Sequence, residues 1–379
     1  MELVNEIVEA RNFWEAWMSV RRNKGAAGID KMSVDVLDVY MPQHMDEIKQ
    51  SICRKQYKPS PVRRVFIPKP NGKQRPLGIP TVVDRVVQQA TAQVLNRIYE
   101  PLFSEHSYGF RPNRSCRQAI NQALDYLNAG YEWVVDFDIE KYFDTVNHDK
   151  LISILREQVN DSATLHLIRS FLKSGVMEGG LVSATTEGVP QGGCISPILS
   201  NIYLDKLDKE LESRELRFVR YADDFDIFVK SERSADRVMA SVSHWLESKL
   251  RLKVSATKTK VVRPTKSVFL GFTFWKSTRG WECRPTDAAK EKLETKVKQI
   301  LVRKRATAKP MSYIFTKLNQ VIRGWVNYYH IGSMATYLRD VFGPWLRHKV
   351  RVVIVKQWKK CSTIHKNLLK IKSIIKSRI

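Results

Sequence analysis

The sequence predicts an α+β fold in which a part with antiparallel strands precedes a helical C-terminal unit. The segments "YEWVVDFDI" (131–139) and "VRYADDFDIFVK" (219–230) are rich in β-branched and aromatic residues, which favours strands. Segments 81–99 and 293–301 instead place apolar residues at helical spacing. The 379 residues, 43% of them hydrophobic, are enough for two or three packed units.

The N-terminal region is predicted to consist of helices joined by the glycine loop "NKGAAGIDKMS" (23–33). Residues 57–80, "YKPSPVRRVFIPKPNGKQRPLGIP", indicate a strand, a Pro/Gly turn and a second short strand, because proline and glycine interrupt helices. Beyond residue 285 three helices are expected. Thr286 is placed to cap the first, Ser312 to start the second, and the third follows Ser333 with an interruption at Gly343 and Pro344.

The charge of the chain predicts a polyanionic partner. Lys and Arg number 64 against 39 Asp and Glu, a net charge of +25, which favours nucleic acid ahead of an anionic membrane. Residues 285–379 hold 22 basic and 4 acidic residues, so the helical unit is the expected polyanion-binding surface. No membrane partner is expected, because the longest purely aliphatic run is the four residues 352–355.

Cysteine and histidine usage argues against a zinc protein. The five cysteines lie more than 60 residues apart and the eight histidines show no paired-ligand spacing. An odd, scattered set of thiols fits a reducing compartment, and the N-terminus lacks the basic start and apolar core of a signal peptide. We therefore expect a cytoplasmic protein.

Two adjacent carboxylates, Asp223 and Asp224, interrupt the strand-like run 219–230. A hairpin turn would explain the bend but not the two charges. Converging carboxylates raise each other's pKa unless a cation neutralises them. Mg²⁺ takes oxygen ligands, and two such ions roughly 3.5–4 Å apart can activate an attacking hydroxyl and stabilise a leaving pyrophosphate.

That chemistry needs a further carboxylate from another strand. The segment "VVDFDIEKYFDTVNH" (134–148) offers Asp136, Asp138, Glu140 and Asp144. Strand alternation puts Asp136 and Asp138 on the same face, so periodicity alone does not choose between them.

Several blocks occur in the order and spacing of reverse transcriptases. These are "VVDFDIEKYFD", "GVPQGGCISPILSNIYLDKLDKEL" (188–211), "RYADDF" (220–225), "LKVSATKTKV" (252–261) and "FLGFTF" (269–274). With "RRVFIPKPNGKQRPLGIPTVVDRVVQQA" (63–90), "YEPLFSEHSYGFRPNRSCRQAI" (99–120) and "IRGWVNYY" (322–329), the chain resembles the bacterial group II intron-encoded reverse transcriptase/maturases.

The resemblance implies a right-hand polymerase fold. Residues 1–60 would form an N-terminal extension whose glycine loop closes over the template. Residues 61–284 would form the fingers and the palm with its antiparallel sheet. Residues 285–379 would form the basic helical thumb, called domain X in maturases. A plain connector remains the alternative for the glycine loop.

The resemblance also implies the metal ligands. In the family the polymerase aspartate stands five residues before an aromatic that blocks ribose, and here that pair is Asp138 and Phe143. Asp138, Asp223, Asp224 and the carbonyl of Ile139 would hold two Mg²⁺ ions, with Mn²⁺ as a substitute. Asp136 would then make a local hydrogen bond, and Asp144 and His148 would cap or orient the following helix.

Substrate contacts follow from the same resemblance. Lys69 and Arg75 would bind the dNTP triphosphate, Gln191 would touch the incoming sugar, and Phe143 would exclude a 2′-hydroxyl. Lys258 would donate a proton to departing pyrophosphate, although Ser255 replaces the asparagine common in the family. Template and primer contacts are expected at Arg111 and Arg114, and at Gly271 in the primer-grip block.

The function implied is RNA-directed DNA polymerisation. Its partners would be an RNA template, a DNA or RNA primer, dNTPs and a structured intron RNA that the protein helps to splice. Two alternatives remain: a free-standing reverse transcriptase in DNA repair or phage defence, and a non-catalytic RNA chaperone. DNA cleavage is not expected, because no His/Asn/Cys cluster for a nuclease is found.

Overall fold

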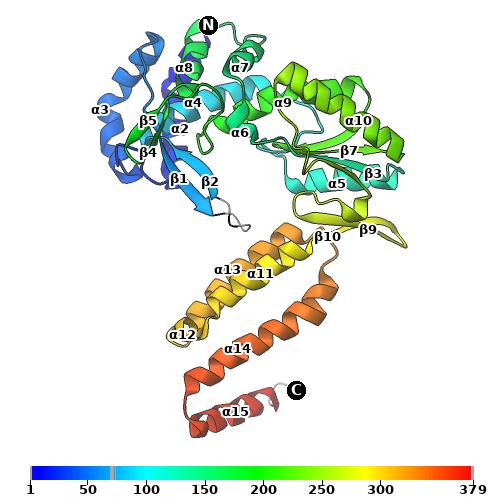
Figure 1. Ribbon diagram of the computed structural model, residues 1–379. Coiled ribbons are helices and arrows are strands. Elements are labelled where there is room, and N and C mark those ends of the chain that lie inside the picture. The colour runs from blue at the N-terminus through cyan, green and yellow to red at the C-terminus, as the bar shows by residue number, and fades with distance from the viewer. Residues whose placement is uncertain (1, 69–71, 73, 377–379) are drawn as a thin grey trace. The chain divides into compact units, whose positions relative to one another are not determined.

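The structure is a computed structural model that describes residues 2–68, 72 and 74–376. It divides into two compact units, Met1–Val262 and Arg263–Ile379 (Figure 1). The second unit begins before residue 285, the expected start of the helical domain, because it includes a β-hairpin. Backbone hydrogen bonds tie that hairpin to the helices: Thr286 N–H donates to Gly271 O at 3.1 Å, and Ser333 N–H donates to Cys283 O at 2.8 Å.

The first unit begins with a helical layer. It contains α1 (Leu3–Val8), α2 (Ala10–Asn23), α3 (Val34–Cys53), α4 (Val82–Tyr99) and α8 (Ser162–Leu172). Their apolar faces share one buried core that includes Phe13, Leu37, Val86 and Phe171. The glycine loop lies between α2 and α3 as expected, and α4 confirms the helix predicted over 81–99.

Beside this layer lies a four-stranded sheet of order β2-β1-β4-β5. Strands β1 (Val62–Pro68) and β2 (Gln74–Ile79) pair antiparallel, which confirms the two predicted strands. The predicted turn between them lies, apart from Gly72, outside the described residues. Strands β4 (Val176–Glu178) and β5 (Leu181–Ser183) form a short hairpin, and β4 runs parallel to β1.

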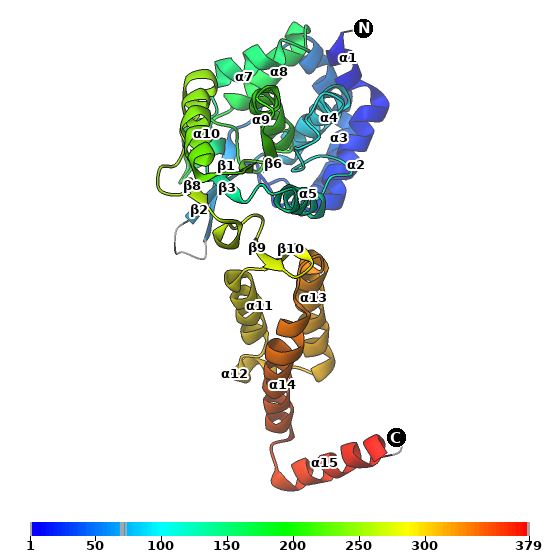
Figure 2. The same ribbon diagram turned by 90° about the vertical axis from the view of Figure 1, so that its right-hand side faces the viewer.

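The second sheet has the order β6-β7-β3-β8, and all its neighbouring strands are antiparallel. The strands are β3 (Trp133–Phe137), β6 (Arg217–Tyr221), β7 (Asp224–Val229) and β8 (Lys260–Val262). Helices α9 (Ser196–Ser213) and α10 (Glu232–Trp245), the latter extended by a π-helical turn (Leu246–Leu250), lie on one face, and α5 (Cys116–Asn128) lies on the other (Figures 1 and 2). The short helices α6 (Tyr142–Thr145) and α7 (His148–Leu155) follow β3.

Strand alternation explains why this sheet is covered on both faces. In β7, Phe225 and Ile227 enter the main core of the unit, whereas Phe228 meets Tyr126 of α5 with ring centroids 5.6 Å apart. Phe225 also stacks on Phe137 of β3 at 4.7 Å. Apolar side chains therefore cover both faces of the sheet, and the Phe225–Phe137 stack lies next to the end that carries the aspartates.

The second unit joins a hairpin, β9 (Phe272–Ser277) and β10 (Gly280–Pro285), to helices α11 (Asp287–Ile300), α12 (Arg303–Ala306), α13 (Met311–Tyr329), α14 (Gly343–Trp358) and α15 (Cys361–Lys376). A short 3₁₀ turn (Pro264–Lys266) precedes the hairpin and a π-helical turn (Tyr337–Phe342) precedes α14. Thr286 caps α11 as predicted, since its hydroxyl accepts from Ala289 N–H at 3.2 Å. None of the helices in the described residues is long and apolar enough to cross a membrane.

Candidate functional site

The three predicted aspartates lie at one end of the second sheet. The β6–β7 hairpin closes with the pair Tyr221↔Asp224, so Ala222 and Asp223 form its turn, and Ala222 has φ +60°. Asp138 lies one residue beyond the last β3–β7 pair, Phe137↔Phe225. The antiparallel register therefore brings Asp138 to the same sheet end as Asp224.

The carboxylates lie close enough to repel one another. Removal of water, and then the negative charges of neighbouring aspartates, raise the pKa of Asp224 to about 6. Those neighbours are Asp223, Asp138 and Asp136. Burial likewise raises the pKa of Asp223, with Asp138 adding to the shift and Arg75 opposing it.

Lys258 supplies a positive charge in direct contact with Asp138. Its Nζ donates to both carboxylate oxygens of Asp138, at 2.8 and 3.0 Å. Asp136, by contrast, lies within the ladder opposite Asp226 and Lys260 and makes an ion pair with Lys260 at 3.4 Å. Asp136 is thus held by the sheet, whereas Asp138 lies just past its end.

The donor chemistry of this cluster fits a divalent cation. Carboxylate oxygens are the ligands that Mg²⁺ prefers, and a cation would relieve the repulsion that raises the pKa of Asp224. Within the described residues, however, no group of three or more His, Cys, Asp or Glu side chains is already arranged as a metal site. Coordination by Asp138, Asp223 and Asp224, and by the carbonyl of the buried Ile139, stays a prediction.

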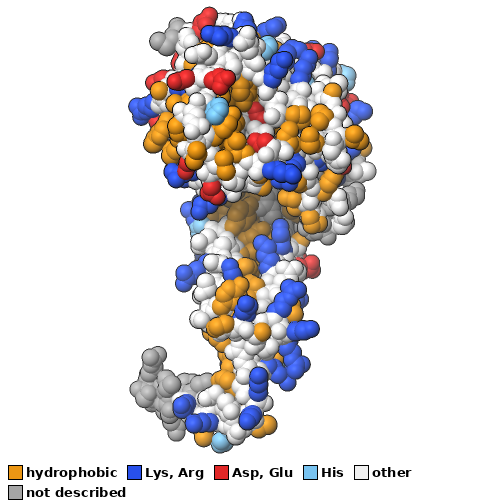
Figure 3. Space-filling view, turned by 90° about the vertical axis from the view of Figure 1, so that its left-hand side faces the viewer, with side chains coloured by type: hydrophobic (Ala, Val, Ile, Leu, Met, Phe, Trp, Pro, Cys, Tyr) orange, Lys and Arg blue, Asp and Glu red, His pale blue; other side chains and the backbone are white. Residues whose placement is uncertain are grey.

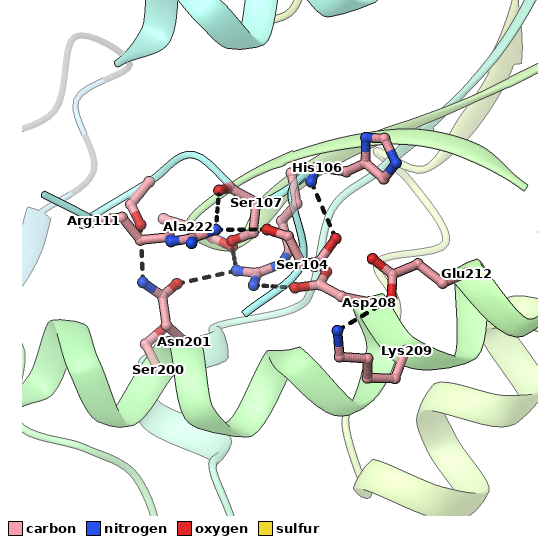
Figure 4. Close-up of polar contacts among 12 residues, drawn as sticks. Ser104, His106, Ser107, Arg111, Ser200, Asn201, Asp208, Lys209, Glu212 and Ala222 are labelled. Atoms are coloured by element: carbon pink, nitrogen blue, oxygen red, sulfur yellow. Dashed lines mark hydrogen bonds and ion pairs between the residues drawn. The ribbon is translucent and has the colours of Figure 1, made fainter. Parts of the chain in front are cut away.

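A buried ion pair between β6 and α9 supports the turn that carries Asp223. Arg220 and Asp208 have side chains that are both 0% exposed, and the Arg220 Nε donates to Asp208 Oδ1 at 2.7 Å. The Arg220 guanidinium also donates to Ala222 O at 2.9 Å and to Asn201 Oδ1 at 3.2 Å. Figure 4 shows Asn201 and Asp208 projecting from α9 toward Ala222. The network thus connects the helix directly to the backbone of the turn.

A loop over residues 104–111 supports the same turn from the side. Tyr108 N–H donates to Arg220 O at 2.9 Å, and Asn201 Nδ2 donates to Gly109 O at 2.9 Å. A Cβ on Gly109 would lie 2.3 Å from Ala222 N, so only glycine allows this approach. The sequence analysis did not identify Arg220, Asn201 or Asp208, although all three lie in the family blocks.

Arg111 and Arg114 serve this loop rather than lying free on the surface. The Arg111 side chain is 3% exposed, pairs with Glu100 at 2.9 Å and donates to Ser107 O at 2.8 Å (Figure 4). Arg114 pairs with Glu105 and lies over the Tyr108 ring, 5.8 Å from its centroid. Contact of either arginine with a template stays a prediction, and the burial of Arg111 gives it a structural role.

A cavity of about 380 Å³ lies between the first sheet and α6. Phe143 and Gln191 line it, and Arg75 Nε donates to Gln191 Oε1 at 3.0 Å. Gly78 N–H donates to Gln191 O at 2.7 Å, which fixes β2 against the "PQGG" loop. Lys69 lies outside the described residues.

His148 has a role that the sequence analysis missed. Besides starting α7, its Nε2 bonds to Gly188 O at 2.7 Å. Val189 N–H donates to Phe143 O at 2.6 Å, and Gly188 N–H donates to Val146 O at 2.8 Å. A Cβ on Gly188 would lie 2.9 Å from Phe143 O. His148 and these backbone bonds together fix Phe143 relative to the loop that carries Gln191.

Gly271 belongs to the second unit. It has φ +81°, and a Cβ there would lie 2.7 Å from the hydroxyl of Tyr329. Glycine is therefore required by both backbone and packing at this position. Contact of Gly271 with a primer stays a prediction.

Comparison with known proteins gives two family matches. Residues 67–274 match "Reverse transcriptase (RNA-dependent DNA polymerase)", and residues 290–371 match "Group II intron, maturase-specific domain". "Protein YkfC" of Escherichia coli (strain K12) is 34% identical over 290 residues, which cover 66% of this chain and 76% of that protein. "Group II intron-encoded protein LtrA" of Lactococcus lactis subsp. cremoris is 31% identical over 326 residues, which cover 69% of this chain and 54% of that protein.

A solved structure, "Partial Cas6-RT-Cas1--Cas2 complex", aligns with a TM-score of 0.41 and 22% identity over 66% of this chain and 43% of that chain. The present chain spans about half the length of the intron-encoded relative from Lactococcus lactis.

Breaking the buried pair should destabilise the first unit strongly. Asp208→Leu leaves the Arg220 charge buried without its carboxylate, so we expect a loss of about 3–5 kcal/mol in the free energy of unfolding. Replacing both residues, as Arg220→Met with Asp208→Leu, should cost less than Asp208→Leu alone. Denaturant unfolding measures both variants. Lys206→Ala, which removes the exposed Lys206–Glu157 pair, is the control and should cost about 1 kcal/mol or less. Equal losses for Asp208→Leu and Lys206→Ala would contradict this account.

Asp205 on α9 predicts a pH dependence of stability. Burial and the charge of Asp208 raise its pKa to about 6, above the value of about 3.9 typical of an unfolded chain. Asp205 Oδ1 is buried without a hydrogen-bond partner in the described part of the chain. The folded state binds the proton of the Asp205 carboxyl more tightly than the unfolded chain does. The contribution of Asp205 to the free energy of unfolding is therefore fully present below about pH 4 and is lost as the pH rises through about 6.

Asp205→Asn should therefore raise the free energy of unfolding at pH 7 by on the order of 2 kcal/mol and change it little at pH 4. Unfolding curves across this pH range provide the measurement. Asp236→Asn, at an exposed position of α10, should show no such trend. A difference between wild type and Asp205→Asn that stays constant from pH 4 to pH 7 would refute the assignment.

Proposed function

We propose that this chain, which belongs to the group II intron-encoded reverse transcriptase/maturase family, adds dNTPs to a primer on an RNA template. The observation that carries the proposal is the convergence of Asp138 with Asp223 and Asp224 at one sheet end, inside the region that matches the family. The mixed sheets and helices, and a cavity of about 380 Å³ lined by Phe143 and Gln191, suit that reaction.

In the proposed reaction the primer 3′-oxygen attacks the α-phosphate of a dNTP and pyrophosphate leaves. Divalent ions bound by the three aspartates would neutralise the negative charge on the attacking and leaving oxygens. Arg75, held by Gln191, presents a guanidinium toward the triphosphate. Lys258, already beside Asp138, has an ammonium proton available for the departing pyrophosphate.

A fixed Phe143 would select the sugar. Its backbone carbonyl accepts from Val189 N–H, which fixes the backbone of Phe143 relative to the loop that carries Gln191, and its side chain lines the cavity. A 2′-hydroxyl would then meet an aromatic wall, which favours deoxynucleotides.

The second unit would act as the thumb and bind intron RNA. Its support is the match of residues 290–371 to a maturase-specific domain together with the excess of Lys and Arg over this unit (Figure 3). This match favours a role in splicing over the free-standing enzyme. Electrostatic binding of this kind weakens steeply as salt increases.

Primer extension on an RNA template with dNTPs and Mg²⁺ tests the catalytic proposal. Asp223→Ala should lower the rate by about 10³-fold or more, because it removes a charge that acts on the reacting phosphate. Asp236→Ala is the surface control and should leave the rate unchanged. Equally low incorporation by wild type and Asp223→Ala would contradict the polymerase proposal and favour the RNA chaperone.

Sugar selection gives a separate test. Phe143→Ala should raise the use of ribonucleotides relative to deoxynucleotides by about 10- to 100-fold, since the steric barrier is removed. His148→Leu should shift the same ratio by a smaller factor, because the loop that bonds to Phe143 O through Val189 N–H loses its contact at Gly188 O. His148→Gln retains a donor for Gly188 O. Single-nucleotide kcat/KM values measure the ratio. An unchanged ratio in Phe143→Ala would remove this residue from the sugar site.

A further inference from the structure

A pocket of about 750 Å³ lies in the second unit where α11, α12 and α13 meet. Ile300 and Ile314 contribute apolar wall, and Ile314 is 2% exposed because it also packs into the core of the helices. Tyr313, next to it, is 50% exposed. The pocket thus combines an apolar floor with an accessible aromatic ring and has the size of a small-ligand site.

The rim of this pocket is basic and not neutralised. Lys304, Arg305, Lys309 and Lys317 line it. The sequence contains no Asp or Glu between Glu294 and Asp340, and in the described structure none of these four cations pairs with a carboxylate. A solvated helix surface usually mixes charges of both signs, so a run of this length without acid indicates an anionic partner.

The aromatic ring lies between two of these cations. Lys309 Nζ and Lys317 Nζ lie 5.8 and 5.9 Å from the centroid of the Tyr313 ring. Lys317 lies one helical turn after the tyrosine on α13, and Lys309 lies in the connection just before that helix. Both ammonium groups lie over the ring, so a base that stacks on Tyr313 takes the place of one of them. The displaced lysine, which has a long flexible side chain, is then available to a flanking phosphate.

The pocket is formed before any ligand arrives. Gln357 of α14 donates through Nε2 to Ala306 O at 3.2 Å and to Lys309 O at 2.7 Å. Thr307 Oγ1 donates to Arg303 O at 2.8 Å. Since α14 fixes the connection from α12 to α13, binding would not have to order this segment first, and less affinity is lost to entropy.

We propose that this pocket binds one unpaired nucleotide of an RNA, with the base on Tyr313 and the neighbouring phosphates on Lys309 and Lys317. Stacking needs an accessible base face, which a duplex does not offer and a loop, bulge or single-stranded end does. The inference rests on the proposed function in that it assumes the second unit meets RNA. It goes further by assigning a residue-level site and the state of the nucleotide.

Binding of fluorescent ten-nucleotide oligouridine and oligoadenosine to the full chain provides the test. Tyr313→Ala should weaken binding of these strands by about 5- to 100-fold, the range of one lost base stack. Tyr313→Phe keeps the ring and should stay within about twofold of wild type. Phe315→Ala is the matched control, because Phe315 is 44% exposed on the same helix but does not line the pocket. Binding of a blunt RNA duplex should be the same for Tyr313→Ala and wild type.

Two further arms identify the source of the nucleotide. Cross-linking with 4-thiouridine is compared for a structured RNA with an unpaired loop and for a primer–template with a single-stranded overhang. Loss of the cross-link in Tyr313→Ala on either substrate supports the site and names its source. The proposal is overturned if Tyr313→Ala and Phe315→Ala bind the oligonucleotides equally, or if Tyr313→Ala weakens duplex binding by the same factor. Primer extension by wild type is measured in parallel. Failure of the proposed polymerase function is then distinguishable from failure of the pocket to bind a nucleotide.

Discussion

The buried pair between Arg220 and Asp208 is the constraint on which the acidic site depends. A guanidinium with no exposed surface must keep its carboxylate and its remaining acceptors, because an unpaired buried charge costs several kcal/mol. One of those acceptors is Ala222 O, in the turn that carries Asp223. Arg220 thus cannot lose its partners without a large cost, and the same side chain fixes the backbone of the turn. Because Arg220 also binds Asp208 of α9, a shift of α9 would move the turn as well.

The site needs this support because its aspartate carboxylates repel one another. Burial, and then the charges of Asp223, Asp138 and Asp136, raise the pKa of Asp224 to about 6. These carboxylates would move apart if the turn were free to do so. The loop over 104–111 prevents such movement from one side, where Gly109 lies against Ala222. On the opposite side of β7, β3 is paired over its whole length and leaves Asp138 just beyond its last pair. Rigid neighbours therefore hold together groups that repel.

Local sequence patterns predicted local features well. The β6–β7 hairpin and the Thr286 cap follow from residue types that neighbour one another in the chain. Contacts between distant segments could not be predicted in this way: the bond from His148 to Gly188 spans 40 residues. The choice of Asp138 over Asp136 came from the family resemblance alone. Its physical reason is visible only in the ladder, where Asp136 faces Lys260. Nor does sequence show that Arg111 is buried.

Nucleic-acid binding and catalysis place opposite electrostatic demands on this chain. Phosphates are attracted by the excess of basic residues beyond residue 285, yet the proposed reaction requires a phosphate to approach three carboxylates. Screening limits each charge to a range of about 8 Å at physiological ionic strength, so the overall charge of +25 cannot cancel a local repulsion. Neutralisation has to come from groups at the cluster itself. Lys258 on Asp138 and Arg75 near Asp223 meet part of that demand, and the part left over is the reason to expect divalent cations there.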